Sequence, residues 1–371
     1  MAITTGTTPT NPCLMLQEAL IRYYGKDPAA TMYSTGTLEA LQSPQNKSGQ
    51  MELVTGSGAK PTTTSNRKIQ MRYVPKTCET SGVSWSECSY GTPEEPLWKT
   101  ADITINREET FGFDLTESEY RDMCETLADG RMAYFNAKFA DATARLNAKA
   151  IIDVVAAMGD YPISGNNSVT TPITVPVSIP AGAFNPAGYG LIQTVYNQMN
   201  VMEAPIIIGA GKLDYARNAA FYSGLTNLGL DGSKGTIPYF RDPYVNSGFF
   251  NDGDDHILTF RPGSIIMAEW LDFVGIYEKE TTIKINGVEQ SEKILTTTVM
   301  PDGSTWDTLY VLDCSVHKFR FKRNIGIAPI PSDAFGSTCQ PYNWAVHFLA
   351  GCADLTCSDI NNLVGPGAQS S

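Results

Sequence analysis

Three aspartates and a histidine stand close together in the run NDGDDH, at Asp252, Asp254, Asp255 and His256. Carboxylate oxygens with an imidazole nitrogen are a donor set that could ligate a hard cation such as Ca²⁺. The run lacks the D-x-[DN]-x-[DN]-G spacing of an EF-hand loop. A solvated β-turn is therefore the favoured interpretation, and the sequence leaves open whether a metal binds there.

A second group of potential metal ligands comprises Cys339, His347, Cys352 and Cys357. Their spacing matches no standard zinc pattern. The chain has eight cysteines but no C-x-x-C pair, which favours buried, reduced thiols over a disulfide framework. We therefore expect neither a metal centre nor a cofactor.

Two further motifs bear on catalysis. The tetrapeptide GAGK at 209–212 follows a β-prone run, as a phosphate-binding turn does, but Leu213 stands where the P-loop requires a hydroxyl for Mg²⁺. A tight turn between a strand and a helix is favoured. No G-x-S-x-G nucleophile elbow occurs. Because no constellation supports an active site, we expect a protein that is not an enzyme.

The run HKFRFKRN has the alternation of a strand. Lys318, Arg320 and Lys322 fall on one face, and Phe319 and Phe321 fall on the other. One interpretation is a basic stripe that contacts nucleic acid or an acidic partner surface. The other, which we favour, is a strand with a solvated charged face.

Charge and hydropathy narrow the class of protein. The chain has 371 residues and a net charge of −12, so it is a poor candidate for tight binding to nucleic-acid phosphates. No apolar run approaches the roughly 20 residues of a membrane span. The first 20 residues lack the basic and apolar regions of a signal peptide. We expect folding in a cytoplasm and no membrane partner.

A long helix is the main element expected to position these residues. Thr116 and Glu119 form a T-x-x-E capping box, and the pattern predicts a helix from Glu117 to Met158, roughly 60 Å long. Gly130 is its weak point. Apolar residues recur at helical spacing along one face: Tyr120, Met123, Leu127, Phe135, Phe139, Ala142, Leu146, Ala150 and Val154.

The rest of the chain favours strands and turns. RKIQMRYV, with Ile69, Met71 and Tyr73 on one face, and TADITINR predict two strands of a hairpin with an elaborate tip between them. The tip has little apolar material for a core of its own, so we expect it to lie on another subunit. Asn286-Gly287 and Pro301-Asp302-Gly303 predict turns between later strands.

This element order resembles that of the major capsid proteins of tailed bacteriophages, the Hong Kong-type or Johnson fold, which is α+β. The resemblance covers nearly the whole chain and rests on architecture more than on a diagnostic motif. It implies an N-terminal arm (1–47), an E-loop hairpin (48–112), a P-domain in two parts (113–184 with the spine helix, and 301–371 with the C-terminal tail) and an A-domain (185–300).

The resemblance also implies a function. The chain would self-assemble into hexamers and pentamers of an icosahedral shell, built in the host bacterial cytoplasm, that encloses double-stranded DNA with weak, non-specific contact. Portal, scaffold and decoration proteins are its implied further partners. Large aromatic and basic side chains dominate interface energetics, so the candidate subunit-interface residues are Tyr73, Trp85, Trp98, Lys318, Arg320 and Lys322.

Other functions fit the same sequence. An encapsulin-type nanocompartment shell resembles the same fold but encloses protein cargo. A carbohydrate-binding or enzymatic β-rich protein would draw on the acidic run at 252–256 and on exposed aromatic residues. Another phage structural protein, of the tail or of the head-completion apparatus, would form tubes or rings.

Overall fold

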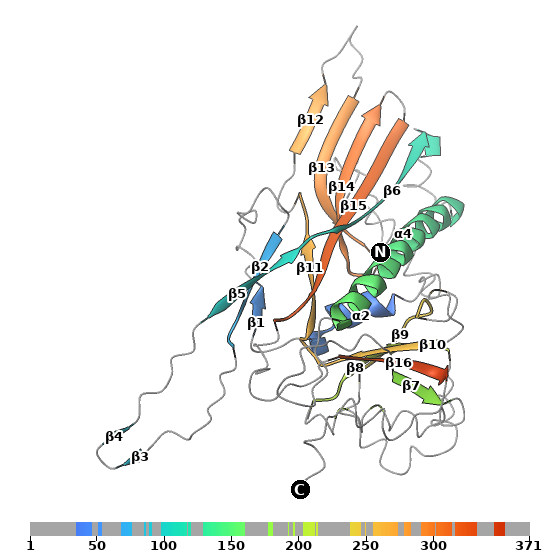
Figure 1. Cartoon of the computed structure of the whole chain (residues 1–371). Helices are drawn as coiled ribbons and strands as arrows, with labels where there is room; N and C mark the ends of the chain where they lie inside the picture. Colours follow the sequence, from blue (N-terminus) through green and yellow to red (C-terminus); the bar gives the residue numbers. More distant parts are fainter. Residues whose placement is uncertain are drawn as a thin grey trace, which may run out of the picture. The chain divides into compact units, whose positions relative to one another are not determined.

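The computed structural model describes part of the chain (Figure 1), which divides into two compact units. The first unit comprises residues 1–33, 105–146 and 269–325, and the second comprises 34–104, 147–268 and 326–371. Helices and sheets are both present, as an α+β fold requires. The described residues are 35–46, 51–53, 68–75, 85–86, 89–90, 98–116, 118–119, 129–159, 177–180, 192, 196, 203–211, 213, 238–245, 249, 255–273, 278–282, 291–300, 302–313, 316–331 and 345–352.

A six-stranded sheet supplies most of the first unit. Its order is β11-β15-β14-β13-β12, and β6 also pairs with β15. The turn predicted at Pro301-Asp302-Gly303 joins β13 to β14, and Gly303 has a φ of 81°, the left-handed conformation that favours glycine. The turn predicted at Asn286-Gly287 lies outside the described residues. It falls between β12 and β13, which pair with each other. The strands are β6 (Arg107–Thr116), β11 (Ile265–Trp270), β12 (Glu278–Thr282), β13 (Ser291–Val299), β14 (Thr305–Asp313) and β15 (Val316–Pro329).

The sheet draws strands from several of the segments that the sequence separates, since β6 also spans the boundary at residue 112. Strands β12 and β13 lie within 185–300, the predicted A-domain, whereas β14 and β15 lie within 301–371, the predicted second part of the P-domain. All four strands pair in succession in one sheet. The sequence boundary at residue 300 therefore falls at the turn between two paired strands.

The predicted capping box is confirmed at the end of β6. The Thr116 backbone N–H donates to Glu119 Oε2 at 2.8 Å, and the Glu119 N–H donates to Thr116 Oγ1 at 3.4 Å. Residues 118 and 119 are helical. The described long helix, α4, runs from Asp129 to Gly159, so Gly130 lies inside it. The predicted stretch 120–128 between these two pieces lies outside the described residues.

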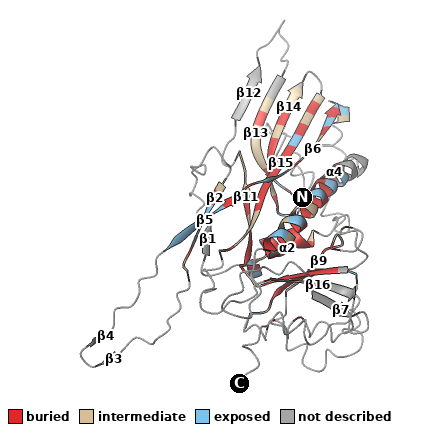
Figure 2. Ribbon diagram, viewed as in Figure 1, coloured by how far each residue is buried: buried red, intermediate tan, exposed pale blue. Residues whose placement is uncertain are grey.

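Aromatic side chains fill the space between α4 and the sheet. Phe135 and Phe139 of α4 pack on Phe111 of β6 with ring centroids 5.8 and 5.9 Å away. Phe111 stacks on Phe321 of β15 at 4.7 Å and meets Trp306 of β14 edge to face at 5.2 Å. Each of these side chains is at most 7% exposed. The apolar face predicted from Phe135 to Val154 is confirmed as buried (Figure 2).

Two ion pairs, each with one buried partner, lie beside this core. Arg145 of α4 donates from Nε to Glu109 of β6 at 2.6 Å. Arg323 of β15 is only 1% exposed and is paired through Nη2 with Glu269 of β11. The alternation predicted for HKFRFKRN therefore holds through Arg323, which shares the buried face of Phe319 and Phe321, and breaks at Asn324, which is buried as well.

In the second unit, a three-stranded antiparallel sheet has the order β1-β2-β5, with β1 Met51–Leu53, β2 Lys68–Tyr73 and β5 Lys99–Thr104. The predicted face of Ile69, Met71 and Tyr73 is confirmed as buried. The hairpin between β2 and β5 carries a separate two-stranded sheet, in which Trp85 of β3 (Trp85–Ser86) pairs with Tyr90 of β4 (Ser89–Tyr90).

A five-stranded mixed sheet, ordered β7-β16-β10-β8-β9, also belongs to the second unit. Its centre is apolar, because Ile206, Ile207 and Ile208 of β8 are wholly buried. The strands are β7 (Val177–Pro180), β8 (Ile206–Gly209), β9 (Tyr239–Arg241), β10 (Asp255–Phe260) and β16 (Ala345–Cys352). Ile192 and Tyr196 are helical and buried.

A wholly buried carboxylate, Asp242, holds helix α2 (Gly36–Gln42) in the second unit. Its Oδ2 accepts hydrogen bonds from the Thr37 N–H at 2.9 Å, the Thr37 hydroxyl at 2.6 Å and Asn147 Nδ2 of α4 at 2.7 Å. Its Oδ1 accepts one from the Tyr244 N–H at 3.0 Å. A Cβ on Gly36 would lie 2.2 Å from the Arg241 carbonyl oxygen, so this close approach of α2 to β9 requires glycine.

Among the described helices, none is both long and apolar enough to cross a bilayer.

Candidate interaction surface

A groove of about 500 Å³ lies in the first unit, on the face of β6, β15 and β14 whose side chains alternate with the buried phenylalanines. Its basic residues belong to the stripe that the sequence predicts. Arg320 lies between Gly112 of β6 and Leu309 of β14, and Lys322 lies between Thr110 and Asp307. The lining consists of Thr110, Phe111, Gly112, Phe273, Asp307, Leu309, Arg320, Phe321 and Lys322.

The two groove cations are paired within the chain. Arg320 Nη1 donates to Asp114 Oδ1 at 2.6 Å and also to the backbone carbonyls of Phe113 and Phe319. Lys322 Nζ donates to Asp272 Oδ2 at 2.5 Å. Lys318, two residues before Arg320 on the same face, is half-buried. Because Arg320 and Lys322 are compensated by carboxylates, the groove is not a strongly basic surface.

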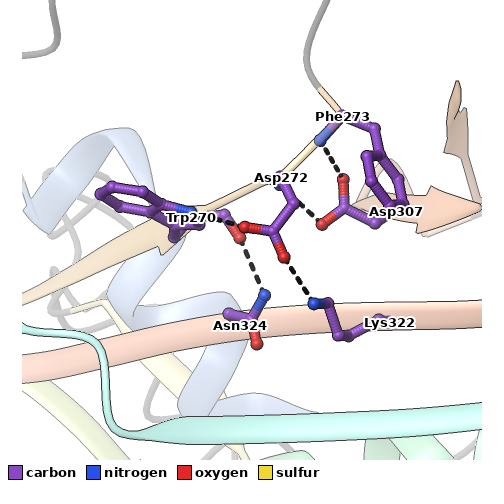
Figure 3. Close-up of polar contacts among 6 residues, drawn as sticks. All are labelled: Trp270, Asp272, Phe273, Asp307, Lys322 and Asn324. Atoms are coloured by element: carbon purple, nitrogen blue, oxygen red, sulfur yellow. Dashed lines mark hydrogen bonds and ion pairs between the residues drawn. The ribbon is translucent and has the colours of Figure 1, made fainter. Parts of the chain in front are cut away.

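Asp307 anchors the turn that follows β11 (Figure 3). Its carboxylate accepts the backbone N–H of Asp272 at 2.8 Å and that of Phe273 at 2.9 Å. Asp272 in turn accepts the indole N–H of Trp270 at 2.8 Å as well as the Lys322 ammonium. This network fixes Phe273 at the edge of the groove, since the Phe273 backbone is held by the buried carboxylate beneath it.

The pKa of Asp307 is raised above its ordinary value of 3.8, chiefly by burial and further by the charge of Asp272, against the lowering effect of the two backbone hydrogen bonds and of Lys322. An acid whose pKa is higher in the folded state contributes stability below its unfolded pKa, and loses it as the pH rises through the folded pKa. We therefore expect the stability advantage of the wild type over Asp307→Asn to shrink as the pH rises from below 3.8.

Urea unfolding of both proteins at a series of pH values measures this difference. The matched control is Asp102→Asn, because the Asp102 side chain is half exposed and forms only a 3.6 Å surface pair with Lys68. A difference between wild type and Asp307→Asn that stays constant from pH 3 to 7 contradicts the predicted direction.

The missing side chain at Gly112 shapes the groove. A Cβ built there would lie 2.6 Å from the Phe319 carbonyl oxygen and 2.6 Å from Cδ of Arg320. Glycine therefore lets the Arg320 side chain lie across β6 toward Asp114. Without that space, the guanidinium would point away from the strand.

The chemistry of the groove is that of binding. The Phe111 and Phe321 side chains point into the aromatic core on the other face, so this face of the groove presents Leu309, the paired cations of Arg320 and Lys322, and the Asp307 carboxylate, which is held by backbone N–H groups. Among these lining residues no nucleophile stands beside a base.

The structure places the hairpin candidates differently from one another. Tyr73 is 4% exposed and belongs to the core of the three-stranded sheet, where it is covered within its own chain. Trp98, just before β5, is 60% exposed. Trp85 pairs through its backbone with Tyr90 in the separate two-stranded sheet. Of Tyr73 and Trp98, it is therefore Trp98 whose side chain is available to a partner.

Two exposed apolar residues were not singled out by the sequence. Ile152 of α4 is 53% exposed and Val299 of β13 is 48% exposed, and with Trp98 they are the exposed large hydrophobic residues of the described chain. Ile152 is an apolar residue that lies off the helical period of the buried face, and this departure from the period is the sequence signal that marks it as exposed. Val299 precedes the Pro301-Asp302-Gly303 turn, where alternation alone does not assign a face.

The structure describes some of the remaining sequence motifs and not others. The turn predicted at GAGK is confirmed at its ends, since the Leu213 N–H donates to the Ala210 carbonyl at 3.1 Å and Gly211 has a φ of 54°. Asp252 and Asp254, Cys339 and Cys357 lie outside the described residues. His256 and His347, which the sequence assigns to separate candidate groups, come together on neighbouring strands.

No model of a known protein family matches the chain, and no curated protein matches it. Among solved structures, it is similar to the capsid structure of the cyanophage P-SCSP1u, with 12% identity and a TM-score of 0.41 over 78% of this chain and 85% of that one. The capsid asymmetric unit of the cyanophage Pam1 has 8% identity and a TM-score of 0.38 over 77% and 85%. The mature capsid of bacteriophage PhiM1 has 9% identity and a TM-score of 0.38 over 80% and 85%. These three solved structures, which the chain resembles over most of its length, are phage capsids.

Proposed function

We propose that this chain is the major capsid subunit of a tailed phage, and that it self-assembles into hexamers and pentamers of an icosahedral shell enclosing double-stranded DNA. In this proposal 1–47 is the arm, 48–112 the E-loop, 113–184 with 301–371 the P-domain, and 185–300 the A-domain. The shell is built in the host cytoplasm, and portal, scaffold and decoration proteins are its further partners.

The observation that carries the proposal is the hairpin between β2 and β5. Strands β3 and β4 pair with each other in a sheet of their own, apart from the three-stranded sheet at the base of the hairpin. A two-stranded ribbon is at best marginally stable alone in water. A tip of this kind is stabilised when it lies on a partner, and a second copy of the chain is the partner that a closed shell provides.

The helix and sheet of the first unit suit the same role. Helix α4 has 31 residues and is roughly 46 Å long. Its aromatic packing on β6, β14 and β15 makes a rigid element, because interdigitated rings in a buried layer resist deformation. A shell subunit needs such an element to transmit load between the contacts at its two ends.

Charge supports weak contact with enclosed DNA. The net charge is −12, and Arg320 and Lys322 of the basic stripe are already paired with Asp114 and Asp272. Neutralised cations release few counterions on meeting phosphates, so their contribution to nucleic-acid binding is small.

To test the proposal, the full chain is expressed alone and then together with the virion proteins of its own phage. The products are examined by sedimentation velocity and negative-stain electron microscopy. We expect closed shells, or rings of five and six copies. In the double variant Trp85→Ala/Tyr90→Ala, we expect the concentration needed for assembly to rise about tenfold or more, because losing a buried interface aromatic costs about 2 kcal/mol or more.

The matched control is Lys68→Ala, which removes a half-exposed ion pair with Asp102 at the base of the same hairpin. It should assemble as the wild type does, since exposed pairs contribute at most about 1 kcal/mol. A chain that stays monomeric at high concentration and salt, with and without the other virion proteins, contradicts the proposal.

A further inference from the structure

Two histidines that are 91 residues apart in the sequence meet on one face of the five-stranded sheet. Strands β10 and β16 pair antiparallel, with His256 opposite Leu349 and Leu258 opposite His347. The histidines are thus diagonal neighbours. His256 Nδ1 and His347 Nε2 lie 2.7 Å apart, and the ring centroids lie 4.9 Å apart with the planes tilted by 42°.

His256 is buried beside apolar residues, whereas His347 is partly exposed. His256 is 3% exposed, and Leu258 on β10 and Ile208 on β8 are wholly buried. His347 is half-buried, so the pair is reached from its side. Two imidazole nitrogens in line with one another leave room for a single electrophile between them, and in the hydrogen-bonded pair that electrophile is a proton.

The same arrangement suits a metal ion. Imidazole nitrogens bind Zn²⁺ at about 2.0–2.1 Å, so two ligands in tetrahedral geometry lie roughly 3.3 Å apart. The observed 2.7 Å needs an opening of roughly half an ångström, which small χ rotations of two side chains supply. Late first-row divalent ions favour imidazole ligands, whereas Mg²⁺ and Ca²⁺ favour oxygen.

We propose that His256 and His347 form a two-histidine site for a late first-row divalent ion such as Zn²⁺ or Ni²⁺, which takes the place of the proton between the two nitrogens. Within the described residues no group of three or more metal-ligating side chains occurs, and the proposal assigns the ion two protein ligands. The bound ion ties β16, near the C-terminal end of the chain, to β10. This proposal does not depend on the role of the chain in a shell.

Thermal unfolding of the full chain with and without NiCl₂ tests the site. Ni²⁺ is the probe because the eight cysteines bind the softer ions more strongly. We expect Ni²⁺ to raise the Tm of the wild type and EDTA to reverse the rise. In His347→Gln, about tenfold or more Ni²⁺ should be needed for the same rise, since one of two protein ligands is lost.

The matched control is His317→Gln. The third histidine of the chain, His317, lies in the six-stranded sheet, where its Nδ1 is 2.8 Å from the Tyr310 hydroxyl. This variant should keep the full Ni²⁺-dependent rise even where its own Tm is lower. No rise in the wild type, or an equal rise in His347→Gln, overturns the proposal.

A second measurement uses only the wild type, so it tests the site even if the His347→Gln protein does not fold. The wild type loaded with Co²⁺ should show the intense visible d–d absorption of tetrahedral nitrogen ligation. A weak spectrum like that of the aqueous ion, or one dominated by thiolate charge-transfer bands, contradicts a histidine site.

Discussion

Replacing Phe139 with alanine is expected to lower the free energy of unfolding of the unassembled subunit by about 3–5 kcal/mol, as large-to-small changes at buried aromatic sites do. Phe139 is wholly buried in α4. Its ring lies 5.9 Å from those of Phe111 and Trp306 and 6.3 Å from that of Phe135. Removing it leaves a cavity among rigid rings that cannot close over the space. Urea unfolding followed by circular dichroism measures the loss.

The matched control on the same helix is Ile152→Ala. Because Ile152 is 53% exposed, its truncation should change the free energy of unfolding by no more than about 0.5 kcal/mol. Similar losses for the two variants would show that α4 is not packed on the sheet through the aromatic face.

Replacing Asp242 with alanine is expected to destabilise the subunit by several kcal/mol. The change leaves the N–H groups of Thr37 and Tyr244 and the amide of Asn147 without their acceptor. Each buried donor left unsatisfied costs about 1–3 kcal/mol. Helix α2 should loosen first, since two of the four hydrogen bonds come from Thr37. Urea unfolding gives the magnitude, and hydrogen exchange of the α2 amides gives the location.

Thr37→Val is the control for this cluster. It removes one hydroxyl donor, of a 2.6 Å bond, and keeps the carboxylate with its other three hydrogen bonds. The expected loss is about 1 kcal/mol. If Thr37→Val costs as much as Asp242→Ala, the carboxylate is not the centre of the cluster.

Local patterns were enough to predict much of the framework. The capping box at Thr116 and Glu119, the buried face through Phe135 and Phe139, and the turn around Gly303 each depend on residues a few positions apart. Their geometry is set by helical or strand periodicity and by turn stereochemistry, which are properties of the local chain. The α+β class was an expectation of the capsid-fold resemblance, and the helices and sheets of the structure are consistent with it.

The parts that could not be predicted join distant segments. The sequence offers Tyr73 as an interface residue, but the packing of its own sheet buries it. Lys322 was assigned to a basic stripe, and its partner Asp272 is 50 residues away. No local pattern marks the meeting of His256 with His347, or of Thr37 with Asp242, because sheet order and helix docking decide them.

The pairing of β6 with β15 has a consequence for synthesis of the chain. Arg107–Thr116 pairs with residues 316–325, so more than half of the chain separates the two strands. During translation the row of Phe111, Phe113 and Leu115 has no sheet to join until β15 has left the ribosome. Contacts of such long range fold slowly and expose apolar edges meanwhile. We expect nascent and truncated chains that end before residue 316 to be clients of chaperones, and folding to be completed only after β15 is released.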